Sequence, residues 1–98
     1  MRPIVRLTSA AEEDLLEARG WYRDQVPGLD LRFRDAVREA LGRIAERPAL
    51  YAKVYRDIRR ALVHRFPYSI FYRIAGESVL VIAVVHQARD SRFWKRRA

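Results

Sequence analysis

Apolar side chains in the first half of the chain recur every three or four residues, in two runs. The first run steps by four, three, four and four residues, which places its members on one face of a helix. These members are Ala11, Leu15, Ala18, Tyr22 and Val26. Ser9 and Glu12 fit a capping box at the start of this helix. Pro27-Gly28 is expected to end the helix and turn the chain.

The second run predicts another helix, which ends near Arg47 because Pro48 disfavours helical geometry in the residue before it. Its apolar stripe consists of Leu29, Phe33, Val37, Ala40, Leu41 and Ile44. Because the connection between the two helices is so short, we expect them to form an antiparallel hairpin.

After residue 50 the spacing of apolar positions falls from about 3.6 to about 2 residues, which indicates strands. We expect strands over 4–7, 59–66, 68–75 and 79–86, and a short helical turn or tail over 89–98. The last strand is apolar on both faces, so we place it inside the sheet and covered on both sides. The resulting order, β-α-α-β-β-β, is an α+β fold in which a helical hairpin packs on one face of a small, mostly antiparallel sheet.

The composition limits the chemistry that this chain can perform. Its 98 residues make one domain, 1–98. The absence of cysteine excludes disulfides, thiolate zinc sites and a cysteine nucleophile. With two histidines and no carboxylate cluster in the strand half, we expect no metal and no cofactor. The longest apolar run, 79–85, is far shorter than the ~20 residues of a membrane helix. The N-terminus shows no signal-peptide pattern, so we expect a cytoplasmic protein without a membrane partner.

The net charge of +8 is distributed unevenly along the chain. Residues 1–49 hold nine arginines and nine acids, so this half is neutral. Residues 50–98 hold eleven cations against three acids (Asp57, Glu77 and Asp90) and therefore carry the whole excess. A genomic bias toward arginine would not leave one half neutral. We therefore expect an anionic partner for the second half, either nucleic acid or an acidic protein surface.

This order of elements, with this distribution of charge, resembles the RelE/ParE superfamily of bacterial type II toxins. Residues 58–74 are similar to the family's arginine-rich strand, its Phe-Pro-Tyr corner and the Tyr-Arg strand that follows. Residues 81–90 are similar to its apolar last strand, which ends in a His-x-x-Arg-Asp segment. Leu7-Thr8, an acidic helix and the Trp21-Tyr22 pair are also typical. The resemblance covers essentially the whole chain.

The resemblance implies the toxin half of a two-protein module, neutralised by an antitoxin segment that folds on binding. RelE-like members cleave mRNA in the ribosomal decoding site, whereas ParE-like members act on DNA gyrase without nuclease chemistry. RelE-like nucleases usually rely on lysine-rich strands or on a Glu/His pair near the end of the last strand. This chain has two lysines and no acid between Asp57 and Glu77. We therefore favour a ParE-like gyrase inhibitor with an acidic, partly disordered antitoxin. A ribosome-dependent endonuclease is the first alternative and a non-toxic nucleic-acid-binding module the second.

Nuclease chemistry, if the chain has it, requires a group that moves protons and cations that stabilise phosphate charge. We assign these catalytic roles to His86 and Arg65, because histidine titrates near neutral pH and guanidinium suits phosphate. His64 is a further acid or base candidate, and Tyr68 and Tyr72 are candidates for stacking on a base. The structural alternatives are that His86 bonds to backbone at the end of its strand, and that both tyrosines pack in the core.

The predicted target- or antitoxin-binding residues are mostly arginines of the strand half. They are Arg59, Arg60, Arg65, Arg73 and Arg89, together with Trp21 and Tyr22. The first four arginines are expected to form a compact patch, in which Arg59 and Arg65 share one face of a strand and Arg60 takes the other. The alternative is a solvated basic edge that discourages strand pairing between copies. In the tail, Phe93 and Trp94 are expected to pin the chain to the domain, because exposed paired aromatic rings are costly without a partner.

Overall fold

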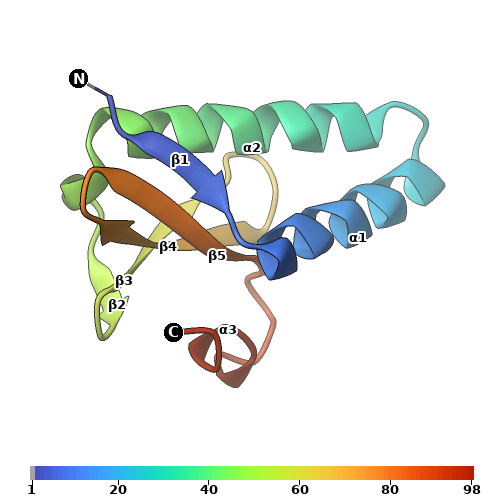
Figure 1. The fold of residues 1–98 in the computed structure, drawn as a ribbon. Coiled ribbons are helices and arrows are strands. Elements are labelled where there is room, and N and C mark those ends of the chain that lie inside the picture. The colour runs from blue at the N-terminus through green and yellow to red at the C-terminus, as the bar shows by residue number, and fades with distance from the viewer. Residues whose placement is uncertain (1) are drawn as a thin grey trace.

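A computed structural model describes residues 2–98 and shows two helices packed on one face of a five-stranded sheet (Figure 1). In chain order the elements are β1 (Ile4–Leu7), α1 (Ser9–Gln25), α2 (Leu29–Glu46), a 3₁₀ turn (Pro48–Leu50), β2 (Lys53–Tyr55), β3 (Ile58–Leu62), β4 (Tyr68–Ala75), β5 (Ser78–His86) and α3 (Arg92–Lys95). The strand order across the sheet is β1-β5-β4-β3-β2. β1 is parallel to β5 and the other pairs are antiparallel. The predicted fold class is confirmed, with β2 as an additional strand.

The start of α1 differs by one residue from the predicted capping box. Thr8, not Ser9, is the N-cap, and its Oγ1 accepts a hydrogen bond from the Ala11 amide at 3.1 Å. Thr8 is extended because its own amide donates to the Val81 carbonyl, which continues the pairing of β1 with β5. The helix can therefore begin only at Ser9.

The prediction that Val26 continues the apolar face of α1 is wrong. Helix α1 ends at Gln25, and Val26 is extended and exposed. The residue before a proline disfavours helical geometry, and Pro27 follows directly. Gly28 then takes a left-handed conformation, with φ of 85°, which glycine adopts at little cost, and α2 begins at the next residue. The predicted α2 stripe is confirmed by the burial of Phe33, Val37, Ala40 and Ile44.

Strand β3 is shorter than predicted and has a partner that was not predicted. It covers Ile58–Leu62, and 63–67 form a turn that is closed by a bond from the Val63 amide to the Tyr68 carbonyl. Arg65 has a left-handed backbone with φ of 72°, which is incompatible with a strand. The predicted sharing of a strand face by Arg59 and Arg65 is therefore wrong, because Arg65 lies in the turn.

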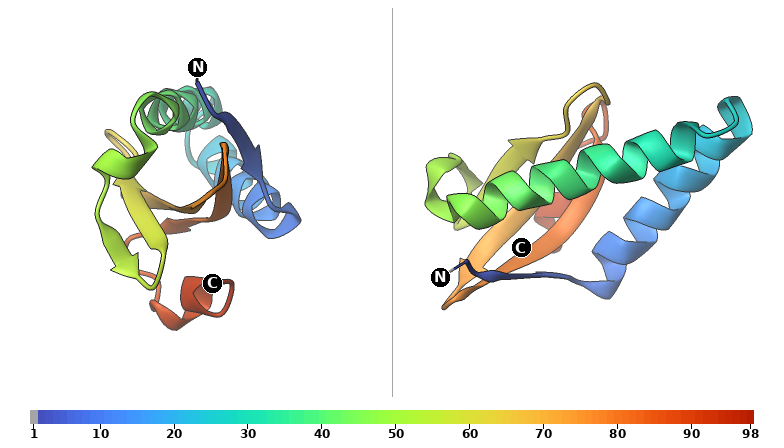
Figure 2. Two further views of the ribbon diagram at one scale, coloured as in Figure 1. Left: turned by 60° about the vertical axis from the view of Figure 1, so that its left-hand side comes forward. Right: turned by 90° about the horizontal axis from the view of Figure 1, so that it is seen from above.

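Strands β4 and β5 bury apolar side chains on both faces, as predicted for the last strand. On the face toward the helices, Ile70 and Tyr72 pack with Phe33 of α2 in the larger core cluster. The opposite face holds Phe71 and Val85 in a smaller cluster that the C-terminal segment covers. Trp94 of α3 stacks on Phe71, with ring centroids 4.0 Å apart, so the predicted pinning of the tail is confirmed. Figure 2 shows α3 and the helical hairpin on opposite sides of the sheet.

Tyr72 makes the stability of this core sensitive to alkaline pH. Its side chain is fully buried, and its hydroxyl donates to the Pro48 carbonyl at 2.5 Å. Burial raises the pKa of Tyr72 to about 12, and the charge of Arg59 only partly opposes this shift. The unfolded chain therefore loses this proton first, near pH 10. The contribution of neutral Tyr72 is complete below pH 10 and is lost as the pH rises from 10 to 12.

We expect this loss to reach about 3 kcal/mol of unfolding free energy over that interval, at ~1.4 kcal/mol per pKa unit. Urea unfolding between pH 8 and pH 12 measures it. The Tyr72→Phe variant is expected to be less stable at pH 8, because it lacks the hydrogen bond to Pro48, but to lose less stability above pH 10. Parallel stability curves for the two proteins would contradict the assignment.

Candidate functional site

Four aromatic rings join the helical hairpin to the sheet at the end where β5 finishes. They are Tyr22 of α1, Phe33 of α2, Phe66 of the β3–β4 turn and Tyr68 of β4, and we call them the aromatic cluster. Their closest ring pair is Phe33 with Tyr68, at 4.9 Å between centroids, and Tyr22 lies 6.0 Å from Tyr68. Trp21 packs edge-on against Tyr22 on one side, and His86 packs edge-on against Tyr68 on the other. The cluster thus positions two predicted site residues at its margins.

One hollow beside the aromatic cluster contains His86, and we call it the His86 hollow. It has a volume of about 300 Å³ and is lined by Asp14, Glu17, Ala18, Trp21, Tyr68, Val84, Val85, His86, Arg89 and Phe93. His86 is exposed, and its Nδ1 accepts a hydrogen bond from the Ala88 amide at 3.0 Å. Because this bond uses the lone pair of Nδ1, the neutral ring carries its proton on Nε2, which is a hydrogen-bond donor. Burial, followed by the charge of Glu17, raises the pKa of Tyr68, so its hydroxyl stays protonated at neutral pH and can donate a hydrogen bond.

A second hollow lies on the other side of the aromatic cluster and contains Arg65, and we call it the Arg65 hollow. Its volume is about 770 Å³, and its lining is Tyr22, Leu29, Arg32, Asp35, Ala36, Glu39, His64, Arg65, Phe66 and Pro67. Tyr22 lines this hollow and Tyr68 lines the other, so the ring contact between them separates the two. The two residues predicted for nuclease catalysis, His86 and Arg65, therefore lie in different hollows.

The predicted compact patch of four strand arginines is divided in the structure. The guanidinium Nη1 of Arg59 donates hydrogen bonds to the carbonyls of Ala49, at 3.1 Å, and Tyr51, at 2.6 Å. These bonds fix the segment that leads into β2. The Nε atom of Arg73 lies 3.9 Å from a carboxylate oxygen of Asp57. Arg60 is exposed and pairs in register with Phe71, on the face opposite Arg59, as the alternation of the strand predicted. Arg65 is in the turn and not on β3, so the prediction that it joins Arg59 and Arg60 on one strand is wrong.

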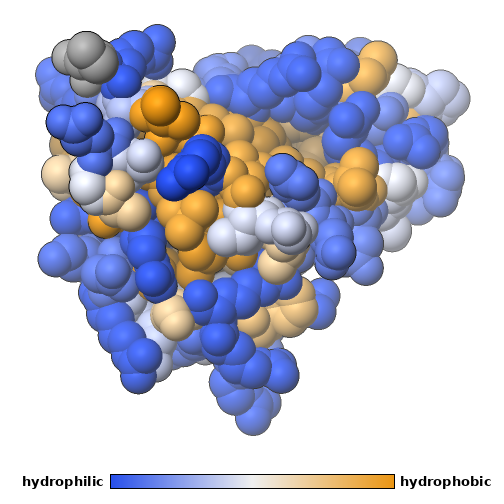
Figure 3. Space-filling model, in the orientation of Figure 1, coloured by the Kyte–Doolittle hydropathy of each residue, from blue (hydrophilic) through white to orange (hydrophobic). Residues whose placement is uncertain are grey.

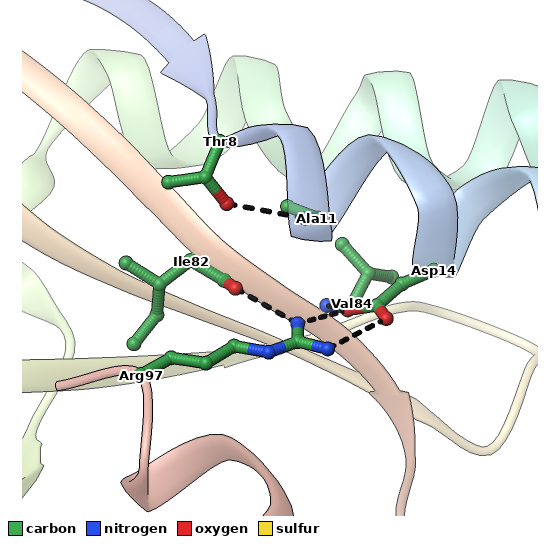
Figure 4. A network of polar contacts seen from close by, with 6 residues as sticks. All are labelled: Thr8, Ala11, Asp14, Ile82, Val84 and Arg97. Atoms are coloured by element: carbon green, nitrogen blue, oxygen red, sulfur yellow. Dashed lines mark hydrogen bonds and ion pairs between the residues drawn. The ribbon is translucent and has the colours of Figure 1, made fainter.

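The most extensively bonded polar pair among the described residues joins α1 to the C-terminal segment, and the sequence did not predict it (Figure 4). Asp14 is 7% exposed, and its two carboxylate oxygens accept bonds from Arg97 at 2.6 and 3.1 Å. Asp14 also accepts from the Val84 amide at 3.0 Å, and Arg97 donates to the Ile82 carbonyl at 3.0 Å. We call this network the Asp14–Arg97 latch. One signal was available: Asp14 lies three residues after Ala11, within the apolar stripe of α1.

The latch provides hydrogen-bond partners for backbone groups at the edge of β5, beyond the residues that pair with β1. The register of β1 with β5 ends at Leu7 and Val81. Past this point the backbone groups of Ile82 and Val84 are bonded by Arg97 and Asp14 instead of by a strand. The latch also places Phe93 and Asp14 in the wall of the His86 hollow. Its role is to position the C-terminal segment beside that hollow.

Two further features concern metal ions and membranes. Among residues 2–98, no three histidine or acidic side chains gather in a way that could hold a metal ion. No helix in the same range combines the length and the apolar character that crossing a bilayer requires.

Comparison with known proteins identifies relatives over most of the chain. A family described as "ParE toxin of type II toxin-antitoxin system, parDE" matches residues 5–91. Toxin ParE2 of Mycobacterium tuberculosis, from strains CDC 1551 / Oshkosh and ATCC 25618 / H37Rv, is 29% identical over 83 residues, which cover 84% of this chain and 79% of the relative.

Two solved structures are similar in fold. A chain of the chromosomal ParDE toxin–antitoxin system from P. aeruginosa matches with a TM-score of 0.77 at 17% identity, over 87% of this chain and 96% of that one. A chain of the toxin–antitoxin complex RelBE2 from Mycobacterium tuberculosis matches with a TM-score of 0.63 at 27% identity, over 88% of this chain and 99% of that one.

Proposed function

Because this chain belongs to the ParE toxin family of type II toxin–antitoxin systems, we propose that it arrests growth by inhibiting DNA gyrase and that an acidic antitoxin neutralises it. The observation that carries the proposal is the family match over residues 5–91, together with the ParE2 relatives. The separation of His86 from Arg65 argues against nuclease catalysis by that pair, because acid–base and phosphate-binding groups must act on the same bond.

The proposed antitoxin contacts lie around the two hollows. Trp21 is 58% exposed on α1 at the rim of the His86 hollow, and a large exposed ring of this kind is a common binding anchor. Arg65 and Arg89 are exposed, one in each hollow, and offer guanidinium groups to antitoxin carboxylates. Tyr22 is buried and acts by supporting Trp21 from beneath. Arg59 and Arg73 are not proposed as antitoxin contacts, because the Arg59 guanidinium binds a backbone carbonyl and the Arg73 guanidinium lies beside Asp57, both within the domain.

One observation favours a ribosome-dependent mRNA endonuclease as a second candidate. The His86 hollow combines an exposed imidazole with Arg89, Glu17 and the Tyr68 hydroxyl, which is a possible set of proton-transfer and phosphate-binding groups. In that mechanism, His86 is the acid or base, Arg89 replaces Arg65 as the phosphate-binding cation, and loss of the imidazole costs ~10²-fold or more in cleavage rate.

The experiment compares the two targets with the same protein. Purified antitoxin-free toxin is expected to lower supercoiling by gyrase and to leave mRNA on translating ribosomes intact. The His86→Ala variant is expected to keep its inhibition of gyrase within about twofold. Addition of the purified antitoxin should restore supercoiling. Codon-positioned mRNA cuts that disappear in His86→Ala, with gyrase unaffected, would overturn the proposal.

A further inference from the structure

The excess charge of the domain gathers on the side of the sheet that faces away from the helical hairpin. Six exposed or half-buried cations lie on α3 and the residues on either side of it, at the β2–β3 turn and on β3. They are Arg56, Arg60, Arg89, Arg92, Lys95 and Arg96, and we call them the basic face. The carboxylates of the segments that supply these cations are Asp57 and Asp90, which pair with Arg73 and Arg92, and Glu17 of α1 lines the His86 hollow with Arg89. Across residues 2–98, no carboxylate lies within 4.0 Å of the charged groups of the other five.

The basic face is continuous in space although its residues are distant in sequence. Lys95 and Arg56 both lie over the Tyr55 ring, at 5.1 and 5.0 Å from its centroid, and that ring packs against Trp94. Arg60 is opposite Phe71, on which Trp94 stacks. Figures 1 and 2 show α3 and the β2–β3 turn on the same side of the molecule, opposite α2. In Figure 3 that lower side is largely hydrophilic, whereas the apolar surface visible in this view lies higher, near β1 and β5.

Aromatic rings hold several of these cations in place, which lowers the entropy that they lose on binding. Arg89 lies 3.8 Å above the Phe93 ring, and Arg97 lies near the same ring at 4.5 Å. Arg89, Arg92 and Arg96 then line one hollow of about 490 Å³ with Asp90 and Phe93. Several guanidinium groups around one hollow suit the closely spaced phosphates of a nucleic acid.

The same rings are not available to stack on bases. Phe93 is close to two guanidinium groups, Tyr55 is covered by Arg56 and Lys95, and Trp94 is 7% exposed against Phe71. Binding of single strands depends on exposed rings on which successive bases stack. Binding to a duplex backbone requires only cations. The basic face therefore favours a duplex over a single strand.

The composition of the face also argues against an acidic protein as its partner. Protein interfaces have an apolar centre surrounded by a polar rim. The exposed large apolar side chains of this domain are Ile4, Leu16, Trp21, Val26, Leu31, Leu50, Val54, Leu62 and Ile74. They lie outside 55–60 and 86–98, the segments that supply the basic face, and only its margins are bordered by Trp21, in the His86 hollow with Arg89, and by Leu62, two residues after Arg60 on β3.

We infer that the toxin itself contacts the phosphate backbone of duplex DNA through the basic face, independently of sequence. This contact does not depend on gyrase being the target. If the protein binds duplex DNA in this way but does not inhibit gyrase, this inference stands and the proposed function is wrong.

Fluorescence anisotropy with the full chain and a labelled 20-base-pair DNA duplex tests the inference. The logarithm of the binding constant is expected to fall linearly with the logarithm of salt concentration, by about 0.9 for each phosphate contacted. The triple variant Arg56→Gln, Arg60→Gln, Arg96→Gln is expected to bind at least about tenfold more weakly at 0.1 M salt, with a salt slope smaller by about 2–3.

The matched control removes three exposed arginines on or next to α2, on the opposite side of the molecule, in the triple variant Arg32→Gln, Arg38→Gln, Arg47→Gln. It has the same net charge as the first variant and is expected to keep the wild-type slope. Thermal melting verifies that all three proteins are folded. Equal losses in both triple variants, binding of single-stranded DNA, duplex RNA or polyglutamate at least as tight as that of the DNA duplex, or no binding to DNA would overturn the inference.

Discussion

Replacement of Arg97 by alanine is expected to lower the free energy of unfolding by about 3–5 kcal/mol. The reason lies in what remains: the Asp14 carboxylate, 7% exposed, keeps its bond to the Val84 amide but loses both bonds from the guanidinium. A buried charge without its partner costs far more than the pair contributes beyond an apolar replacement. Because domains of this size have stabilities of about 5–15 kcal/mol in total, the variant should be close to unfolding.

Urea denaturation of the wild type and Arg97→Ala measures this loss, and Arg96→Ala is the matched control. Arg96 is an exposed neighbour in the same segment, and its Nε bonds only to a carbonyl of its own helix. Its replacement should change stability by about 0.5 kcal/mol or less. In Arg97→Ala, the further change Asp14→Asn should recover part of the loss, because it removes the buried charge. An effect of Arg97→Ala no larger than that of Arg96→Ala would show that the latch does not stabilise the domain.

Replacement of Phe33 by alanine is the second change with a large expected effect, about 3–5 kcal/mol of unfolding free energy. Phe33 is fully buried and contacts three rings of the aromatic cluster, at centroid distances of 4.9 to 5.2 Å. Its removal leaves a cavity between α2 and the sheet, which a close-packed core fills only in part. Because the same rings separate the His86 and Arg65 hollows, antitoxin binding should weaken as well.

The stability loss is measured by thermal and urea unfolding, with Phe33→Leu and Leu31→Ala for comparison. Phe33→Leu keeps an apolar side chain in the space and should cost less than about 1.5 kcal/mol. Leu31 is exposed on the same helix, so its replacement should change stability by about 0.5 kcal/mol or less. If Phe33→Ala were no more destabilising than Leu31→Ala, the aromatic cluster would not join the hairpin to the sheet in the way described.

The helices and the last two strands could be predicted because their signals are local. The stripe of α2 repeats over five turns, and β5 is apolar along nearly all of its length. Strand β2 was missed because three residues are too few for an alternating pattern to be recognised. The early end of β3 depends on the left-handed conformation of Arg65, and an arginine gives no signal for such a turn.

The site was less predictable because its contacts join distant segments. Strand alternation correctly placed Arg59 and Arg60 on opposite faces, but it carried no information about the carbonyls of Ala49 and Tyr51 that Arg59 binds. Likewise, the latch joins residues 83 positions apart. Only the position of Asp14 within an apolar stripe indicated that its carboxylate would be buried, and the identity of its partner depends on how α3 packs.

The separation of Asp14 from Arg97 also has a consequence for biosynthesis. Helix α1 is made early, yet its buried carboxylate stays without a counter-charge until the ribosome has added Arg97, 83 residues later. At typical elongation rates of 5–20 residues per second, that interval is roughly 4–17 s. Strand β1 likewise cannot pair until its parallel neighbour β5 has been synthesised, because residues 4–7 pair only with 78–81. Each nascent chain therefore passes through a period of seconds in which it cannot complete its native structure.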